Sequence, residues 1–255
     1  MKMGIIQGRL SPPTEGFQDT PSDWKKEFDL LQDMGLNHIE WIVTEKSFEN
    51  NPIFTEDLSN YSISSICADN LVSEKIIDTE FLSDNLTPIC EAAIRNKIKN
   101  VTIPILEESS MSDIKKRDKF IIEIQEFSDK YSKLNFSFEI EDKMDVIADI
   151  IFMRDNFYLT YDTGNMTTVG VEHDVYLHLF HEKINNVHLK DRNRDNETVN
   201  PLTGATEFEK IFAKLKELSY NGLYTLQTAR GNFGEEEKTI KNHTKLFKEL
   251  YNECS

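Results

Sequence analysis

The sequence predicts an α/β fold, a single (β/α)8 barrel over residues 1–255. Short apolar, β-branched runs recur along the whole chain, and amphipathic stretches of helical length separate nearly every pair of them. The runs are spaced by about 30 residues, the length of one strand–helix unit of a parallel sheet. No linker, low-complexity tract or shift in composition marks a second domain. A doubly wound open sheet is the main alternative, but eight evenly spaced units match the barrel.

Eight runs are the expected strands. In chain order they are Met3–Gln7, His38–Val43, Ile63–Ala68, Val101–Leu106, Asn135–Ile140, Phe157–Asp162, Asn186–Leu189 and Leu223–Gln227. Parallel strands need crossover helices between them, and the intervening segments are long enough to supply these.

The first helix is predicted between the first two strands. Ser22 is a residue type that caps helices, Trp24, Phe28 and Leu31 are spaced to share one face, and Gly35 provides a stop. The last crossover behaves alike, because the aromatic and leucine positions of 208–215 share a helical face before the turn residues 221–222.

Three long irregular stretches each follow a predicted strand: Gly8–Thr20, Thr44–Pro52 and Lys190–Thr206. In a barrel the loops that follow strands form the face on which active sites lie. We therefore expect these stretches to form the walls of a pocket.

Composition limits the classes of function. Hydrophobic residues make up 38% and charged residues 29%, and no apolar run of 18 residues could cross a bilayer. The N-terminal apolar stretch Met3–Ile6 is too short for a signal-peptide core, so a cytoplasmic protein is expected. Cys67, Cys90 and Cys254 lie far apart, which predicts reduced thiols. A net charge of −16 disfavours nucleic acid as a partner.

Four consecutive predicted strands end in possible metal ligands: Glu139, Asp162, His188 and Gln227. Each alone has an ordinary explanation, such as a strand-end carboxylate, a helix cap, a core histidine or a hydrogen-bonding amide. Together at the matching ends of neighbouring barrel strands they converge on one mouth. Carboxylate, imidazole and amide ligands suit Mn, Co, Zn or Mg, so a divalent metal site is predicted.

Several motifs carry a resemblance to a known family. In chain order they are MGIIQGRLSPP, IEWI, ICAD, FEIE, YDTGN, NVHLKDR and LQTARG. They resemble the xylose isomerase-like TIM-barrel superfamily, and more narrowly its sugar phosphate isomerase/epimerase branch. The resemblance implies a metal-dependent enzyme acting on a small sugar or sugar phosphate, and a homodimer or homotetramer.

The resemblance also implies roles for the four strand-end residues. In the ketose 3-epimerases of the superfamily, two glutamates bind the metal and act as acid and base on opposite faces of the sugar. Glu139 matches the first glutamate, Asp162 the aspartate and His188 the histidine, whereas Gln227 stands in place of the second glutamate. An amide cannot act as a general base near neutral pH. Glu139 is therefore the expected base for abstracting a proton next to a metal-chelated carbonyl, giving an enediolate.

Further polar residues at strand ends are expected to contact the substrate. Gln7, Glu40, Asp69 and Asp191 would position hydroxyl groups, and one of the carboxylates would replace the missing base. Basic side chains are expected to bind a phosphate or carboxylate. These are Arg9, Lys190, Arg192, Arg194 and Arg230. A second metal site at His173, His178 and His181 is not expected, because these residues lie on a predicted helix.

Three other functions stay open at this stage. A keto-sugar or keto-cyclitol lyase or dehydratase would begin with the same proton abstraction. An abasic-site endonuclease would need more histidine ligands and a positive surface. A non-catalytic sugar-binding barrel would have Gln227 as a first step in the loss of activity.

Overall fold

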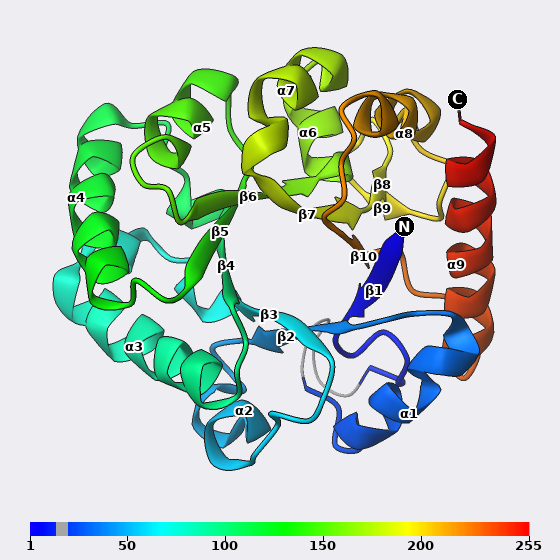
Figure 1. Cartoon of the computed structure of the whole chain (residues 1–255), viewed down its shortest axis with the longest axis horizontal. Helices are drawn as coiled ribbons and strands as arrows, with labels where there is room; N and C mark the ends of the chain where they lie inside the picture. Colours follow the sequence, from blue (N-terminus) through cyan, green and yellow to red (C-terminus); the bar gives the residue numbers. More distant parts are fainter. Residues whose placement is uncertain (14–19, 255) are drawn as a thin grey trace.

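A closed barrel of eight parallel strands forms the centre of the computed structural model, which describes residues 1–13 and 20–254 (Figure 1). The barrel strands are β1 (Lys2–Ile6), β2 (Ile39–Val43), β3 (Ile63–Ala68), β4 (Asn100–Ile105), β5 (Asn135–Ile140), β6 (Phe157–Asp162), β7 (Ile184–Leu189) and β10 (Leu223–Leu226). Their order around the barrel is β1-β10-β7-β6-β5-β4-β3-β2. The predicted fold class is confirmed. Part of the predicted loop Gly8–Thr20, residues 14–19, lies outside the described residues.

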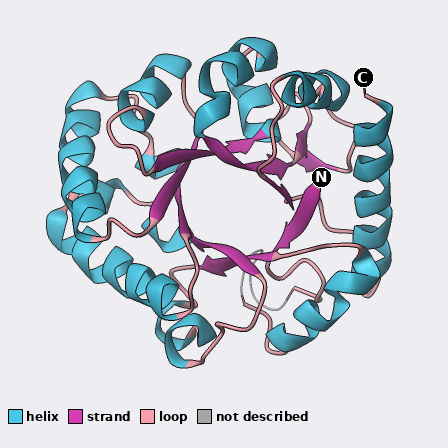
Figure 2. Ribbon diagram, viewed as in Figure 1, coloured by secondary structure: helices cyan, strands magenta, loops and turns pink. Residues whose placement is uncertain are grey.

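Helices surround the barrel on its outside, as Figure 2 shows. They are α1 (Trp24–Met34), α2 (Pro52–Thr55), α3 (Thr79–Arg95), α4 (Ile114–Lys130), α5 (Met144–Ile151), α6 (Thr163–Val169), α7 (His173–Phe180), α8 (Phe208–Glu217) and α9 (Glu236–Glu253). Short 3-10 turns are η1 (Phe48–Asn50), η2 (Asp69–Leu71), η3 (Glu74–Ile77), η4 (Glu107–Ser109) and η5 (His181–Lys183). In the described part of the chain, no helix combines the length and the apolar character needed to cross a membrane.

The first helix shows how local signals place an element. α1 ends before Gly35, which adopts the left-handed conformation with φ of 69°. The backbone N–H of Gly35 donates a hydrogen bond to the carbonyl of Gln32 in the last turn of the helix. Its start differs from the prediction that Ser22 caps it. The helix begins at Trp24, so Asp23 takes the capping position and makes no side-chain cap bond.

Side chains alternate along the barrel strands, and the two faces differ in character. Residues such as Phe138 and Tyr161 belong to the main hydrophobic core. Thr102 on β4 and Asn186 on β7 instead each donate a hydrogen bond to Glu40 on β2, across strands that are not neighbours, so these side chains point into the barrel. The barrel interior therefore contains a buried polar network that reaches the site described below.

The stretch Lys190–Thr206 is less irregular than predicted. β8 (Asp191–Arg192) and β9 (Thr198–Val199) pair in an antiparallel hairpin, with Arg192 opposite Thr198. The carboxylate of Asp191 holds the end of this stretch in place. It accepts hydrogen bonds from the backbone N–H groups of Gly204 at 2.9 Å and Thr206 at 3.1 Å. The hairpin places Thr198 beside the mouth of the barrel.

Candidate metal centre and active site

Three of the four predicted ligands lie together at the ends of neighbouring strands. Glu139 is on β5, and Asp162 on β6 is paired in register with His188 on β7. The described residues hold one group of His, Cys, Asp or Glu side chains suited to an ion, and it consists of these three, whose ligand atoms all lie within 4.8 Å of one another. His188 Nδ1 is 3.4 Å from Glu139 Oε2 and 4.0 Å from Asp162 Oδ2.

Asn165, on the first turn of α6, fixes both carboxylates. Its backbone N–H donates to Asp162 Oδ1 at 2.7 Å, which makes Asp162 the cap of α6. Its side-chain amide donates to Glu139 Oε1 at 2.9 Å. Each carboxylate therefore has one oxygen held by Asn165 and the other turned toward His188 Nδ1.

Glu40 fixes the histidine ring from the other side. His188 Nε2 lies 2.6 Å from Glu40 Oε2, and both side chains are completely buried. Asn186 also donates to Oε2, while Ser65 and Thr102 donate to Oε1. Nδ1 faces the two ligand carboxylates, and a lone pair on Nδ1 for a metal ion requires the single proton of a neutral ring to sit on Nε2, where Glu40 accepts it.

The buried charges of this pair stabilise each other. Burial raises the pKa of Glu40, but the adjacent His188 and the hydroxyl donors outweigh it and hold the value at about 2. Burial lowers the pKa of His188, yet Glu40 and Glu139 beside the ring raise it well above the ordinary value. Glu40 thus remains an anion that orients His188.

Gln227 directly follows β10 and is buried at the same mouth. Its amide oxygen accepts no hydrogen bond from the described residues. A buried acceptor without a partner costs free energy unless something else binds it. Gln227 lines the same cavity as Glu139, so an acceptor without a protein partner lies at this mouth.

A cavity of about 380 Å³ opens over this group. Its wall contains Ile6, Arg9, Cys67, Asp69, Val72, Pro104, Leu106, Glu107, Glu139, Lys190, Arg192, Thr198 and Gln227. The volume suits a small molecule of sugar size. Among the residues predicted to bind substrate, Arg9, Asp69, Lys190 and Arg192 line this cavity.

Asp69 is the wall carboxylate whose ionisation is most perturbed. Burial raises its pKa to about 6, and the negative charges of Glu139 and Glu107 add to the effect. Its titration midpoint therefore lies nearer to neutral pH than that of an ordinary aspartate, which is the direction expected of a group that both gives and takes protons.

Four other residues predicted to bind substrate lie outside the cavity wall. The carboxylates of Glu40 and Asp191 are fully buried and accept hydrogen bonds from protein donors. The oxygen of Gln7 accepts from the backbone of the second strand. Arg230 donates to the carbonyl of Ser11.

Some residues of the site were not expected from the sequence. Glu27 on α1 is buried and holds the loop after β1 by accepting from the N–H groups of Gly8 at 2.8 Å and Leu10 at 3.0 Å. No local sequence signal marks it. Glu107 lines the cavity just after β4, and its strand-end position was the signal that could have identified it.

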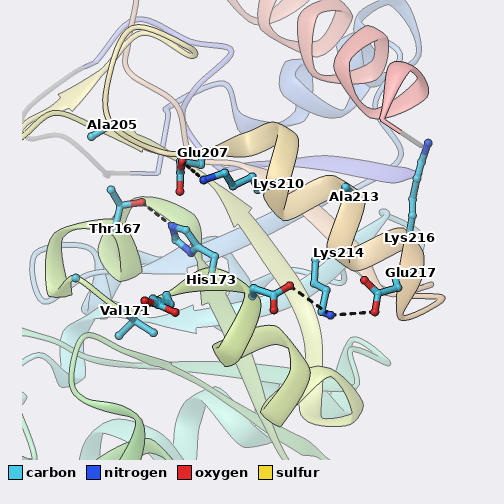
Figure 3. A pocket seen from close by; sticks show the side chains of 13 residues that line it. Thr167, Val171, His173, Ala205, Glu207, Lys210, Ala213, Lys214, Lys216 and Glu217 are labelled. Carbon is cyan, nitrogen blue, oxygen red and sulfur yellow. Dashed lines mark hydrogen bonds and ion pairs between the residues drawn. The ribbon is translucent and has the colours of Figure 1, made fainter.

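A larger cavity lies elsewhere. It has a volume of about 1090 Å³ between the α6–α7 connection and α8 (Figure 3). Its side chains pair with one another: Lys210 with Glu207, and Lys214 with Glu217. None of the predicted site residues lines it, so its size does not make it the candidate active site. Arg194 lies in a separate surface hollow.

Comparison with known proteins places the fold. A family model described as "Xylose isomerase-like TIM barrel" matches residues 113–250. No curated protein sequence matches the chain.

Solved structures cover nearly the whole chain at low identity. An IolI protein crystallised with a zinc atom is 17% identical over 100% of this chain and 99% of its own, with a TM-score of 0.73. D-allulose 3-epimerase from Methylomonas sp. is 14% identical over 98% of both chains, with a TM-score of 0.75. The probable 3-DHS dehydratase AsbF from Bacillus anthracis is 12% identical over 97% of this chain and 99% of its own, with a TM-score of 0.72. At these identities the likeness shows the fold alone.

Proposed function

The chain belongs to the xylose isomerase-like TIM barrel family, and on that premise we propose that it is a metal-dependent isomerase or epimerase of a sugar or sugar phosphate. The observation that carries the proposal is the convergence of Glu139 Oε2, Asp162 Oδ2 and His188 Nδ1 beside a cavity of sugar size. Similar structures include sugar epimerases, which supports a small sugar as the substrate class.

The donor set supports a divalent ion of the kind Mn, Co, Zn or Mg. Glu139, Asp162 and His188 would hold it, with the amide oxygen of Gln227 as a fourth ligand. A bound ion of this kind would supply Lewis-acid polarisation of a substrate carbonyl.

Glu139 is the proposed base. Asn165 fixes one of its oxygens, so the carboxylate keeps one orientation, and the side chain lines the cavity where a substrate would lie. Removal of a proton from the carbon next to the carbonyl gives an enediolate. Return of that proton to the former carbonyl carbon, with transfer of the hydroxyl proton from one oxygen to the other, completes an aldose–ketose isomerisation. Gln227 cannot take a proton, so this chain's own residues favour chemistry that needs one strong base.

A lyase or dehydratase reaction is the second candidate, and Asp69 favours it. A carboxyl group with a pKa of about 6 is partly protonated near neutral pH and can give its proton to a departing hydroxyl group. Asp69 and Glu139 line the same cavity, so proton removal and proton donation would take place within one site.

The proposed reaction can be tested by measuring the incorporation of deuterium from the solvent into the substrate. Purified protein loaded with Mn²⁺ is incubated in deuterated water with D-allulose, D-tagatose and 3-dehydroshikimate as probes, and the products are examined by NMR. We expect deuterium at the carbon next to the carbonyl with every hydroxyl group retained, whereas loss of water identifies the dehydratase. Glu139→Gln should slow the exchange by about 10²- to 10⁴-fold.

The matched control is Glu126→Gln, which removes an exposed carboxylate from α4 outside the barrel. It should leave exchange unchanged. Full exchange in Glu139→Gln would refute Glu139 as the base, and a purified protein that binds no divalent ion would refute the proposed metal chemistry altogether.

A further inference from the structure

The ammonium group of Lys190 lies against one of the ligand atoms. Its Nζ is 2.9 Å from Asp162 Oδ2, the same oxygen that faces His188 Nδ1. Nζ also donates to Asn165 Oδ1 at 3.1 Å. The side chains of Lys190 and Asp162 are 9% and 1% exposed, so solvent screens this ion pair little.

The local backbone is shaped to let Lys190 reach Asp162. The lysine stem passes over Gly164, where an added Cβ would meet Lys190 Cγ at 3.0 Å and Cδ at 3.1 Å. The backbone N–H of Lys190 donates to the hydroxyl of Thr163, which anchors the start of the side chain. A larger residue at position 164 would push the stem away from its place.

The charges at the site imply that this contact affects how tightly a divalent ion binds. The carboxylates of Glu139 and Asp162 would balance the charge of a divalent ion, and Gln227 adds no charge. His188 would bind the ion in its neutral form, with the anion of Glu40 on the far side of the ring. Lys190 then contributes one further positive charge beside a ligand oxygen. Two like charges at short range inside a protein repel by a free energy large enough to change affinity severalfold. A glutamate at position 227 would balance the lysine, but this chain has an amide there.

We propose that Lys190 is a tethered cation that competes with the divalent ion for Asp162 and so sets how tightly the ion binds. Without an ion, Lys190 neutralises Asp162. With an ion bound, the lysine keeps its second partner Asn165. The inference rests on the metal site of the proposed function and adds a positioning residue to it.

The experiment measures Mn²⁺ binding by calorimetry on chelator-treated protein at pH 7.5. Lys190→Met removes the charge but keeps most of the stem, and we expect it to bind Mn²⁺ about tenfold more tightly than the native chain. Lys190→Arg restores the charge and should return the affinity toward the native value. The control Lys183→Met removes the same charge at the opposite end of β7, where the ammonium donates to the carbonyl of Arg154, and should leave Mn²⁺ affinity unchanged.

A second variant covers the case in which Lys190→Met folds poorly. Gly164→Ala displaces the lysine stem without changing any charge, and it also shifts Arg192, whose Cγ would lie 3.1 Å from the added Cβ. Mn²⁺ affinity should change in the same direction by a smaller factor. Unchanged or weaker Mn²⁺ binding in Lys190→Met, with native binding intact, would overturn this inference alone. Failure of the native chain and of every variant to bind Mn²⁺ would overturn the proposed metal site as well.

Discussion

The hydrogen bond between Glu40 and His188 makes Glu40→Gln an informative change at this site. In the native chain Glu40 Oε1 accepts from Ser65 at 2.8 Å and Thr102 at 2.7 Å, and Oε2 accepts from Asn186 at 3.1 Å and His188 at 2.6 Å. Glutamine keeps only one acceptor oxygen. If the two hydroxyl groups retain it, the amide NH₂ group faces the two remaining donors.

The consequence for an ion can be worked from the proton on His188. A ligand lone pair on Nδ1 requires the proton on Nε2, which would then face an NH₂ group instead of a carboxylate. The loss of one charge-assisted hydrogen bond costs about 1.5–3 kcal/mol. If the proton moves to Nδ1 instead, it occupies the ligand atom itself. Either route predicts divalent-ion binding weaker by roughly 10- to 150-fold.

Calorimetric titration with Mn²⁺ at pH 7.5 measures this effect. Glu45→Gln is the matched control, because Glu45 is an exposed carboxylate just beyond the end of β2. Nitrogen NMR of the His188 ring reports which nitrogen carries the proton. Equal Mn²⁺ affinity in Glu40→Gln and the native chain, with the fold intact by circular dichroism, would refute the orienting role of Glu40.

Three further outcomes are expected. Burial lowers the pKa of His38 to about 4, so the unfolded chain binds a proton that the folded chain does not as pH falls from about 6.5 to 4. The free energy of unfolding should drop by up to about 3 kcal/mol over this range. Urea titrations should show that His38→Gln loses less stability than the native chain over the same range. The pKa of Asp69 is raised to about 6, so its charge costs stability above that pH. Asp69→Asn should therefore be more stable by about 1–2 kcal/mol at pH 7.5 but not at pH 4, as urea titration at both pH values will test. Gln227→Glu adds a ligand charge and should tighten Mn²⁺ binding by about tenfold, and calorimetry that shows no gain would count against position 227 as a ligand.

The sequence predicts the barrel well because the signals involved are local. Apolar strand runs, helix spacing and the left-handed Gly35 are each readable within a few residues, and parallel strands force the strand ends onto one face. Glu139, Asp162 and His188 could therefore be expected together.

The supporting residues could not be predicted with the same success. Glu40 precedes His188 by 148 residues, and only the closed barrel brings them within 2.6 Å. Alternation along β2 identifies Glu40 as facing one side of the sheet, but the sequence does not say that the interior partners are Ser65 and Thr102. The role of Asp191 also depends on the hairpin of β8 and β9, whose short strands have too little periodicity to be recognised.

The arrangement of ionisable groups around the mouth bears on the stereochemistry of the proposed reaction. Among the described residues, the carboxylates of the cavity wall are Asp69, Glu107 and Glu139, which follow or end the consecutive strands β3, β4 and β5. Gln227 lies three strands from β5 and cannot exchange a proton. Inversion of a carbon centre by two bases needs groups on opposite faces of the substrate. Carboxylates on one side of the barrel mouth instead favour proton transfer on one face of the substrate. Aldose–ketose isomerisation needs such a transfer, and so does an elimination in which the proton donor lies beside the base.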